Sequence, residues 1–149
     1  MARELTHPNI VRVHELGSQQ GFRYITMELL EGTDLRDKMI AGLSMAKGLD
    51  YLIQICDGLG VAHAKGIVHR DVKPENCFVT TTEAVKILDF GIAKVVSAPG
   101  ATASGAILGT PAYISPEQID DYSGVTHRAE LYSLGIVAYE IFAHRTPLG

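Results

Sequence analysis

HRDVKPEN, the stretch from His69 to Asn76, decides both the fold and the chemistry expected of this chain. These residues follow a predicted helix and precede a predicted short hairpin, so they occupy a loop. The loop places an acid (Asp71), a base (Lys73) and an amide (Asn76) close together in the sequence. Such residues on a loop are usually solvated surface, so the surrounding sequence has to decide their role.

A second aspartate stands at the far end of the predicted hairpin. Asp89 begins the triplet DFG and follows Asp71 by 18 residues. The hairpin, with strands at 77–79 and 85–88, folds the two aspartates toward each other. Two carboxylates with an asparagine between them suit a hard cation such as Mg²⁺, which takes oxygen ligands.

Helices are predicted on both sides of this loop. Ser44 can cap a helix that ends near Lys65, and we expect its apolar stripe to face a core. The stripe consists of Met45, Leu49, Leu52, Ile53, Cys56, Leu59 and His63. Thr126 can open a last helix that extends to about Ala143. That helix is apolar almost all round, so we expect it to be buried on several sides.

Strands are predicted near the start of the chain. Residues 10–16 and 22–30 are expected to form an antiparallel hairpin around a turn at 17–21. After the hairpin, Thr33 can cap a short helix that runs to about Ile40.

Composition and charge disfavour several classes of protein. The chain has 149 residues, of which 46% are hydrophobic and 20% charged, as is typical of a globular domain. A net charge of −4 does not favour a nucleic-acid binder. The longest apolar stretch, 131–143, is interrupted by Glu140 and is too short to span a bilayer. With no signal peptide evident at the start of the sequence, we expect a cytoplasmic protein without a membrane segment.

Six motifs, in order, resemble one family. HRDVKPEN, DFG at 89–91 and SPE at 115–117 are similar to the signature of eukaryotic-type (Hanks-type) serine/threonine protein kinases. Further segments that match this family are HPNIV at 7–11, ITMELLEG at 25–32 and GTPAY at 109–113. These motif sequences resemble those of the bacterial members of the family.

The resemblance implies an α+β, protein-kinase-like fold that is present in part. Residues 1–30 match the end of the small β lobe and the hinge, and residues 31–149 match the first part of the helical large lobe. The family's GxGxxG loop and phosphate-binding strand lysine have no counterpart, because the first lysine of the sequence is Lys38, after the hinge. We therefore expect a kinase domain truncated at both ends, with reduced activity of this stretch alone.

The resemblance also implies roles for individual residues. Asp71 matches the catalytic aspartate that accepts the proton of the substrate hydroxyl, and Lys73 matches a lysine that contacts the γ-phosphate and marks Ser/Thr specificity. Asn76 and Asp89 match the Mg²⁺ ligands. The residues that match the nucleotide site are the gatekeeper Met27, the backbone groups of Glu28 and Leu30 at the adenine edge, Asp34 near the ribose, and Phe78, which either narrows the adenine pocket or stacks on the base.

Regulation is implied for the segment from Asp89 to Glu117. Arg70 matches the arginine that reads a phosphate on this segment, and Thr102 and Ser104 lie where the family carries such phosphates. The two hydroxyl residues are equally compatible with polar residues that only form the loop. Thr110 matches the loop that holds the substrate.

One position departs from the family's pattern. Glu130 stands where the corresponding helix of the family has an aspartate that bonds the catalytic-loop backbone. The longer side chain either keeps that bond with an adjustment or loses it.

The implied function is ATP-dependent transfer of the γ-phosphate to Ser/Thr hydroxyls of proteins, with ATP and Mg²⁺ as cofactors. A second kinase molecule is a further expected partner. The alternative is a non-catalytic, pseudokinase-like interaction module, and the retention of Asp71, Lys73, Asn76 and Asp89 argues against it. A kinase for small molecules is disfavoured by the complete segment GTPAYISPE at 109–117.

Overall fold

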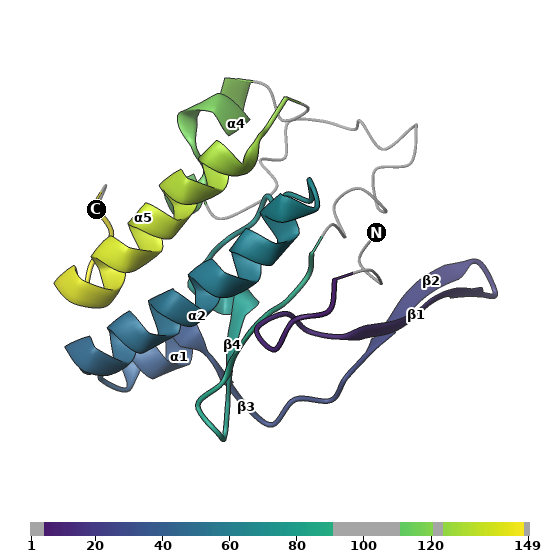
Figure 1. The fold of residues 1–149 in the computed structure, drawn as a ribbon, viewed down its shortest axis with the longest axis horizontal. Coiled ribbons are helices and arrows are strands. Elements are labelled where there is room, and N and C mark those ends of the chain that lie inside the picture. Colours follow the sequence, from purple (N-terminus) through teal and green to yellow (C-terminus); the bar gives the residue numbers. More distant parts are fainter. Residues whose placement is uncertain (1–4, 91–110, 121–123, 148–149) are drawn as a thin grey trace.

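A computed structural model describes residues 5–90, 111–120 and 124–147 of the chain. Strands come first and helices dominate afterwards, which confirms the predicted α+β class (Figure 1). The elements are β1 (Val13–Gln19), β2 (Phe22–Met27), β3 (Gly32–Asp34), α1 (Leu35–Ile40), α2 (Met45–Ala64), η2 (Pro74–Asn76), β4 (Cys77–Thr80), β5 (Val85–Ile87), η3 (Pro111–Tyr113), α4 (Pro116–Asp120) and α5 (His127–Ala143).

The first hairpin forms as predicted, but its turn is shorter than expected. β1 pairs with β2 in antiparallel fashion, and the reversal takes only Gln20 and Gly21, at φ 51° and 83°. Two consecutive residues at positive φ match the twist of the flanking strands, so a longer loop is unnecessary. β1 ends at Gln19, directly before this turn, and begins at Val13. The residue predicted to begin it, Ile10, instead forms an isolated parallel bridge with Ile87 of β5.

The second sheet has three strands in the order β3-β4-β5. The predicted hairpin of β4 and β5 is present, and β3 joins its open edge in antiparallel register. The cap of α1 lies one residue later than predicted: the Asp34 carboxylate accepts a hydrogen bond from the Asp37 N–H at 2.9 Å. The prediction that Thr33 caps α1 is therefore wrong.

α2 begins and ends where the sequence predicts. Ser44 Oγ accepts a hydrogen bond from the Lys47 N–H at 3.3 Å, and Gly66, at φ 68°, follows the last turn. The predicted apolar stripe is only partly right, because Met45, Leu49 and Ile53 are more than half exposed. The residues that α2 buries are Gly48, Tyr51, Leu52, Ile55, Gly58, Leu59 and Ala62.

The core lies on both sides of α2, which runs between α5 and the β3-β4-β5 sheet (Figure 1). Gly58 makes close contact with the sheet possible, because an added Cβ would lie 2.8 Å from the Ile87 side chain. α5 contributes Ile136, Val137 and Ile141 to this core. The prediction that α5 is buried on several sides holds for these residues but not for Leu131, which is 57% exposed. Within the described residues, no helix combines the length and the apolar character needed to cross a bilayer.

We expect Gly32→Ala to destabilise the fold by about 3 kcal/mol. Gly32 has φ 149°, and an added Cβ would lie 2.1 Å from the carbonyl oxygen of Val79 in the paired strand. The matched control is Gly60→Ala on an exposed face of α2, where an added Cβ meets nothing within 4 Å. That change should stabilise the helix by about 0.5–1 kcal/mol. Urea unfolding measures both effects, and a stable Gly32→Ala chain would contradict the β3 geometry.

Candidate active site

His69 organises the loop that follows α2. Its side chain is buried, and its Nδ1 accepts a hydrogen bond from the Asp71 N–H at 3.1 Å. The other ring nitrogen must then carry the proton, so Nε2 donates to the carbonyl of Leu88 at 2.5 Å. The Phe90 ring packs edge-on against the imidazole, with centroids 4.7 Å apart. One side chain thereby ties the catalytic loop to the DFG segment.

The structure brings the predicted catalytic residues together around one oxygen. Lys73 Nζ and Asn76 Nδ2 both lie 2.9 Å from Oδ2 of Asp71, one as an ion pair and the other as a hydrogen-bond donor. Asn76 Nδ2 also donates to the Asp71 carbonyl at 2.8 Å, which closes the loop on itself. The Asp71 side chain is 43% exposed. Its Oδ1 bonds to none of the described residues, so this oxygen can receive a hydroxyl group.

The two predicted metal ligands lie on connected backbone segments. The Leu88 N–H donates to the carbonyl of Asn76 at 2.9 Å, which ties the residue before Asp89 to Asn76. Within the described residues, the hydrogen bonds of the Asn76 side chain are made by Nδ2, so its amide oxygen keeps its lone pairs. Asp89 is exposed and has φ 62°, a region that aspartate tolerates better than most residues.

These two residues fit Mg²⁺ as a pair. One amide oxygen and one carboxylate are the kind of protein ligands that Mg²⁺ uses when phosphate and water complete its octahedron. No group of three or more His, Cys, Asp and Glu side chains able to hold a metal by themselves occurs among the described residues. One amide oxygen and one carboxylate thus fit a metal whose remaining ligands come from phosphate and water.

The hinge is held through the side chain of Glu28. Its Oε1 accepts hydrogen bonds from Lys86 Nζ at 2.9 Å and from the Arg12 N–H at 2.8 Å. Burial alone would raise the pKa of this carboxyl, but the hydrogen bonds from Lys86 and Arg12 outweigh it and hold the pKa below its ordinary value. The hinge is thereby pinned to β5, next to the residues that lead into DFG.

The remaining predicted nucleotide residues fall into two groups. Asp34 and Phe78 are cross-strand partners in the β3-β4 register, so the structure brings them together. One carboxylate oxygen of Asp34 is used in capping α1. Met27 ends β2 and is 38% exposed, and Leu30 lies on the connection that follows it.

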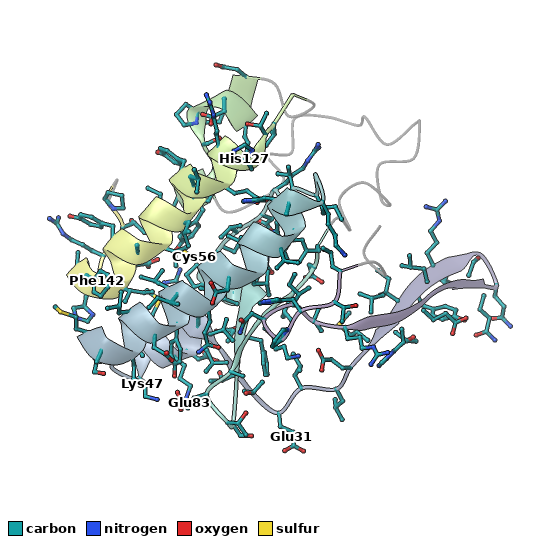
Figure 2. All side chains as sticks on the ribbon, viewed as in Figure 1. Glu31, Lys47, Cys56, Glu83, His127 and Phe142 are labelled. Atoms are coloured by element: carbon teal, nitrogen blue, oxygen red, sulfur yellow. The ribbon has the colours of Figure 1, made fainter. Side chains whose placement is uncertain are left out.

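Glu130 keeps its bond to the catalytic loop, so the alternative left open by the sequence is decided. Its carboxylate is 2% exposed, and Oε1 accepts a hydrogen bond from the Arg70 N–H at 2.6 Å. The other oxygen pairs with His63 Nε2 of α2. Beyond it, the ring of His127, labelled on α5 in Figure 2, lies 5.5 Å from that of His63. The carbonyl of Arg70 is bonded as well, by Gln118 of α4 at 3.0 Å.

A half-buried charged cluster, not anticipated from the sequence, supports the other end of the loop. Arg36 of α1 pairs with Glu75 at 3.0 Å and with Glu140 of α5 at 2.5 Å, and Tyr113 bonds to both Arg36 and Glu140. Burial alone would lower the pKa of Arg36, but the bonds to Glu140, Glu75 and Tyr113 raise it above its ordinary value. The signal in the sequence was Glu140 inside an apolar helix, because a buried carboxylate needs a partner.

Three predicted residues, Thr102, Ser104 and Thr110, lie outside the described residues. A separate cluster around Glu83 joins Lys38 of α1 to Lys47 and Tyr51 in the first half of α2; Glu83 and Lys47 are labelled in Figure 2. This cluster fastens the β4-β5 turn to α1 and α2, and we assign it a structural role.

Comparison with known proteins agrees with the geometry. The family described as "Protein kinase domain" matches residues 1–149. Serine/threonine-protein kinase PknA of Mycobacterium tuberculosis is 43% identical over 96% of this chain and 35% of its own length. Pkn1 of Myxococcus xanthus is 42% identical over 95% of this chain and 21% of its own, and the probable kinase pknA2 of Bifidobacterium longum is 38% identical over 98% and 19%.

These relatives are bacterial proteins named serine/threonine-protein kinases, and the chain spans about a third of their length or less. The family match nevertheless extends over every motif quoted above. The order of strands and helices agrees with the end of a small β lobe followed by the start of a helical lobe. The chain therefore belongs to the protein kinase domain family, among the eukaryotic-type serine/threonine kinases of bacteria.

Proposed function

We propose that this chain carries the catalytic loop of an ATP-dependent enzyme that phosphorylates Ser/Thr hydroxyls of proteins. The observation that supports this most directly is the Asp71 carboxylate, whose Oδ2 is engaged by Lys73 and Asn76 while Oδ1 bonds to none of the residues that the structure describes. A carboxylate held in this way has a fixed direction and one oxygen available for a substrate proton. That arrangement suits positioning and general-base catalysis.

In the proposed reaction, the hydroxyl oxygen of the substrate forms a bond to the γ-phosphorus as the bond to the β-phosphate oxygen breaks. Asp71 orients the hydroxyl and accepts its proton at Oδ1. Lys73, 2.9 Å from Asp71, places a positive charge where the transferring phosphoryl group gathers negative charge. Both groups act from one loop, so the placement of both depends on the alignment of this loop.

Asn76 and Asp89 would hold Mg²⁺ through the amide oxygen and the carboxylate. A bound Mg²⁺ supplies charge neutralisation to the phosphates. The adenine would lie beside the hinge, with backbone groups of Glu28 and Leu30 at its edge and with Asp34 and Phe78 beneath the sugar and base. The register that pairs Asp34 with Phe78 supports this arrangement.

The proposal extends to the binding of the protein substrate, to regulation by phosphorylation and to the location in the cell. Thr110 would belong to the loop that holds the protein substrate, and a phosphate on Thr102 or Ser104 would pair with Arg70. The setting we propose is the cytoplasm. The pseudokinase-like alternative gains no support from the relatives, which are named as kinases.

We expect Asp71→Asn to lower phosphotransfer to a generic basic protein by about 10²–10⁴-fold, because the amide cannot accept the proton. The matched control is Asp57→Asn on the exposed face of α2, which should leave turnover unchanged. Incorporation of labelled γ-phosphate measures both. Equal turnover in the two variants would contradict the role of Asp71, and no turnover by the wild-type chain would contradict the proposed activity of this stretch.

Binding of Mg²⁺ and ATP can be tested separately from turnover. ATP should raise the unfolding temperature only when Mg²⁺ is present, by an amount that corresponds to about 2.7 kcal/mol at a hundredfold excess over Kd. Asp89→Asn should remove the Mg²⁺-dependent part, because it removes one of two protein ligands. Asp57→Asn again serves as the control. A shift that is the same with EDTA as with Mg²⁺ would contradict the metal site.

Glu28→Gln should make the chain less stable at pH 7, by less than about 1 kcal/mol because the pair with Lys86 is partly exposed. The pKa of Glu28 is lowered on folding, so its contribution is complete above the unfolded pKa, near 4.5, and is lost as the pH falls through the folded pKa. Urea unfolding at pH 7, 5 and 3 should show the difference vanish at the lowest pH. A difference that persists there would indicate packing instead of charge.

A further inference from the structure

We propose that Gln118 is a positioning residue for the catalytic aspartate, and that it makes the placement of Asp71 depend on the docking of α4. This inference rests on the proposed function, because Asp71 is the catalytic residue only if the chain transfers phosphate. Gln118 touches neither substrate nor metal. It acts through the backbone of the catalytic loop, 48 residues earlier in the chain.

The side chain of Gln118 has two separate tasks. Its Oε1 accepts a hydrogen bond from the Ser115 N–H at 3.2 Å, within its own turn. Its Nε2 donates to the carbonyl of Arg70 at 3.0 Å, across to the catalytic loop. The two partners fix the orientation of the amide, because a flipped amide would oppose donor to donor and acceptor to acceptor.

The bonded carbonyl belongs to the peptide unit that leads directly into Asp71. A peptide unit is planar, so the Arg70 carbonyl and the Asp71 N–H turn together. His69 accepts the N–H of this unit at 3.1 Å, and Gln118 holds its carbonyl at 3.0 Å. With both ends bonded, the plane cannot rotate without breaking a hydrogen bond. The direction in which Asp71 leaves the backbone is thereby set.

This fixation matters because Arg70 has an unfavourable backbone conformation. Its φ is 74°, a value that residues other than glycine rarely adopt and that persists only when the surrounding structure enforces it. Glu130 of α5 holds the N–H of Arg70 and Gln118 of α4 holds its carbonyl. Two elements distant in the sequence therefore hold the backbone conformation of Arg70. Removal of either would let this residue relax toward ordinary dihedral angles.

The two elements differ in how firmly they are attached. α5 is a helix of 17 residues with much of one face in the core, whereas α4 has five residues, of which Gln118 is the buried one. The neighbour of Gln118, Ile119, is 71% exposed. Among the residues that the structure describes, the amide of Gln118 makes the one side-chain hydrogen bond from α4 to the catalytic loop. Undocking of α4 breaks the hydrogen bond to Arg70, so the placement of Asp71 depends on whether this short helix is docked.

The test uses amide hydrogen exchange of the whole chain, which requires no activity. Gln118→Glu at pH 8 keeps an acceptor for Ser115 but opposes a carboxylate to the Arg70 carbonyl. Gln118→Met removes both bonds without adding charge. We expect the amide of Asp71 to exchange roughly tenfold faster in both variants. The matched controls are Gln54→Glu and Gln54→Met, since Gln54 likewise donates to a backbone carbonyl, that of Glu83 at 3.2 Å.

The second readout is turnover. The Gln118 variants should lower kcat by about tenfold to a hundredfold, as misplacement of a catalytic group does, with the KM for ATP unchanged. The Gln54 variants should lower stability without lowering kcat. An Asp71 amide that exchanges as in the wild type, or equal kcat in the Gln118 and Gln54 variants, would overturn the proposal. If the wild-type chain shows no turnover, the proposed function fails while hydrogen exchange still decides the role of Gln118.

If both Gln118 variants fail to fold, hydrogen exchange of the wild-type chain tests the coupling instead. The backbone N–H of Gln118 donates to the Ser115 carbonyl at 3.0 Å, so its exchange reports the opening of α4. If α4 and the catalytic loop open together, the amides of Gln118 and Asp71 exchange with the same opening free energy. Opening equilibrium constants for the two amides that differ by more than tenfold would refute the coupling.

Discussion

The buried carboxylate of Glu130 is the contact on which the rest of the structure depends. It is 2% exposed and bonds in two directions, to the Arg70 N–H of the catalytic loop and to His63 of α2. A carboxylate enclosed to this degree is costly unless each oxygen has a partner. Because both partners exist only when α2, α5 and the loop are in place, one side chain makes the three elements mutually dependent.

The same helix carries a second buried acid, and the pair explains an otherwise puzzling sequence. α5 is largely apolar, yet Glu130 and Glu140 both point into the protein. Glu140 meets Arg36 and Tyr113, so it joins α1 and the segment before α4 to the helix. α5 therefore supports the catalytic loop at both ends by charge and hydrogen bonds, and between them by apolar packing. An apolar helix with two unpaired acids would not be stable in this position.

Local signals in the sequence predict local structure well and distant contacts poorly. Ser44 and Thr126 cap their helices as predicted, since a cap depends on residues two or three positions away. The predicted apolar stripe of α2 is only partly right, because Met45 and Leu49 share the helical period with the true core residues. Only the neighbouring elements decide which face of the helix is covered. The grouping of Asp71 with Asn76 could be predicted because the two residues lie in one loop, whereas the hydrogen bond between Gln118 and Arg70 joins residues 48 positions apart.

Glu130 shows why such contacts escape sequence analysis. From the sequence, the longer side chain could have kept or lost its bond. The structure keeps it at 2.6 Å, because the second oxygen is drawn to His63, which holds the carboxylate between the two partners. A histidine in the last turn of α2 is therefore in direct contact with an acid in the first turn of α5. Residues at these two positions should change together, since either one alone leaves a buried polar group without its partner.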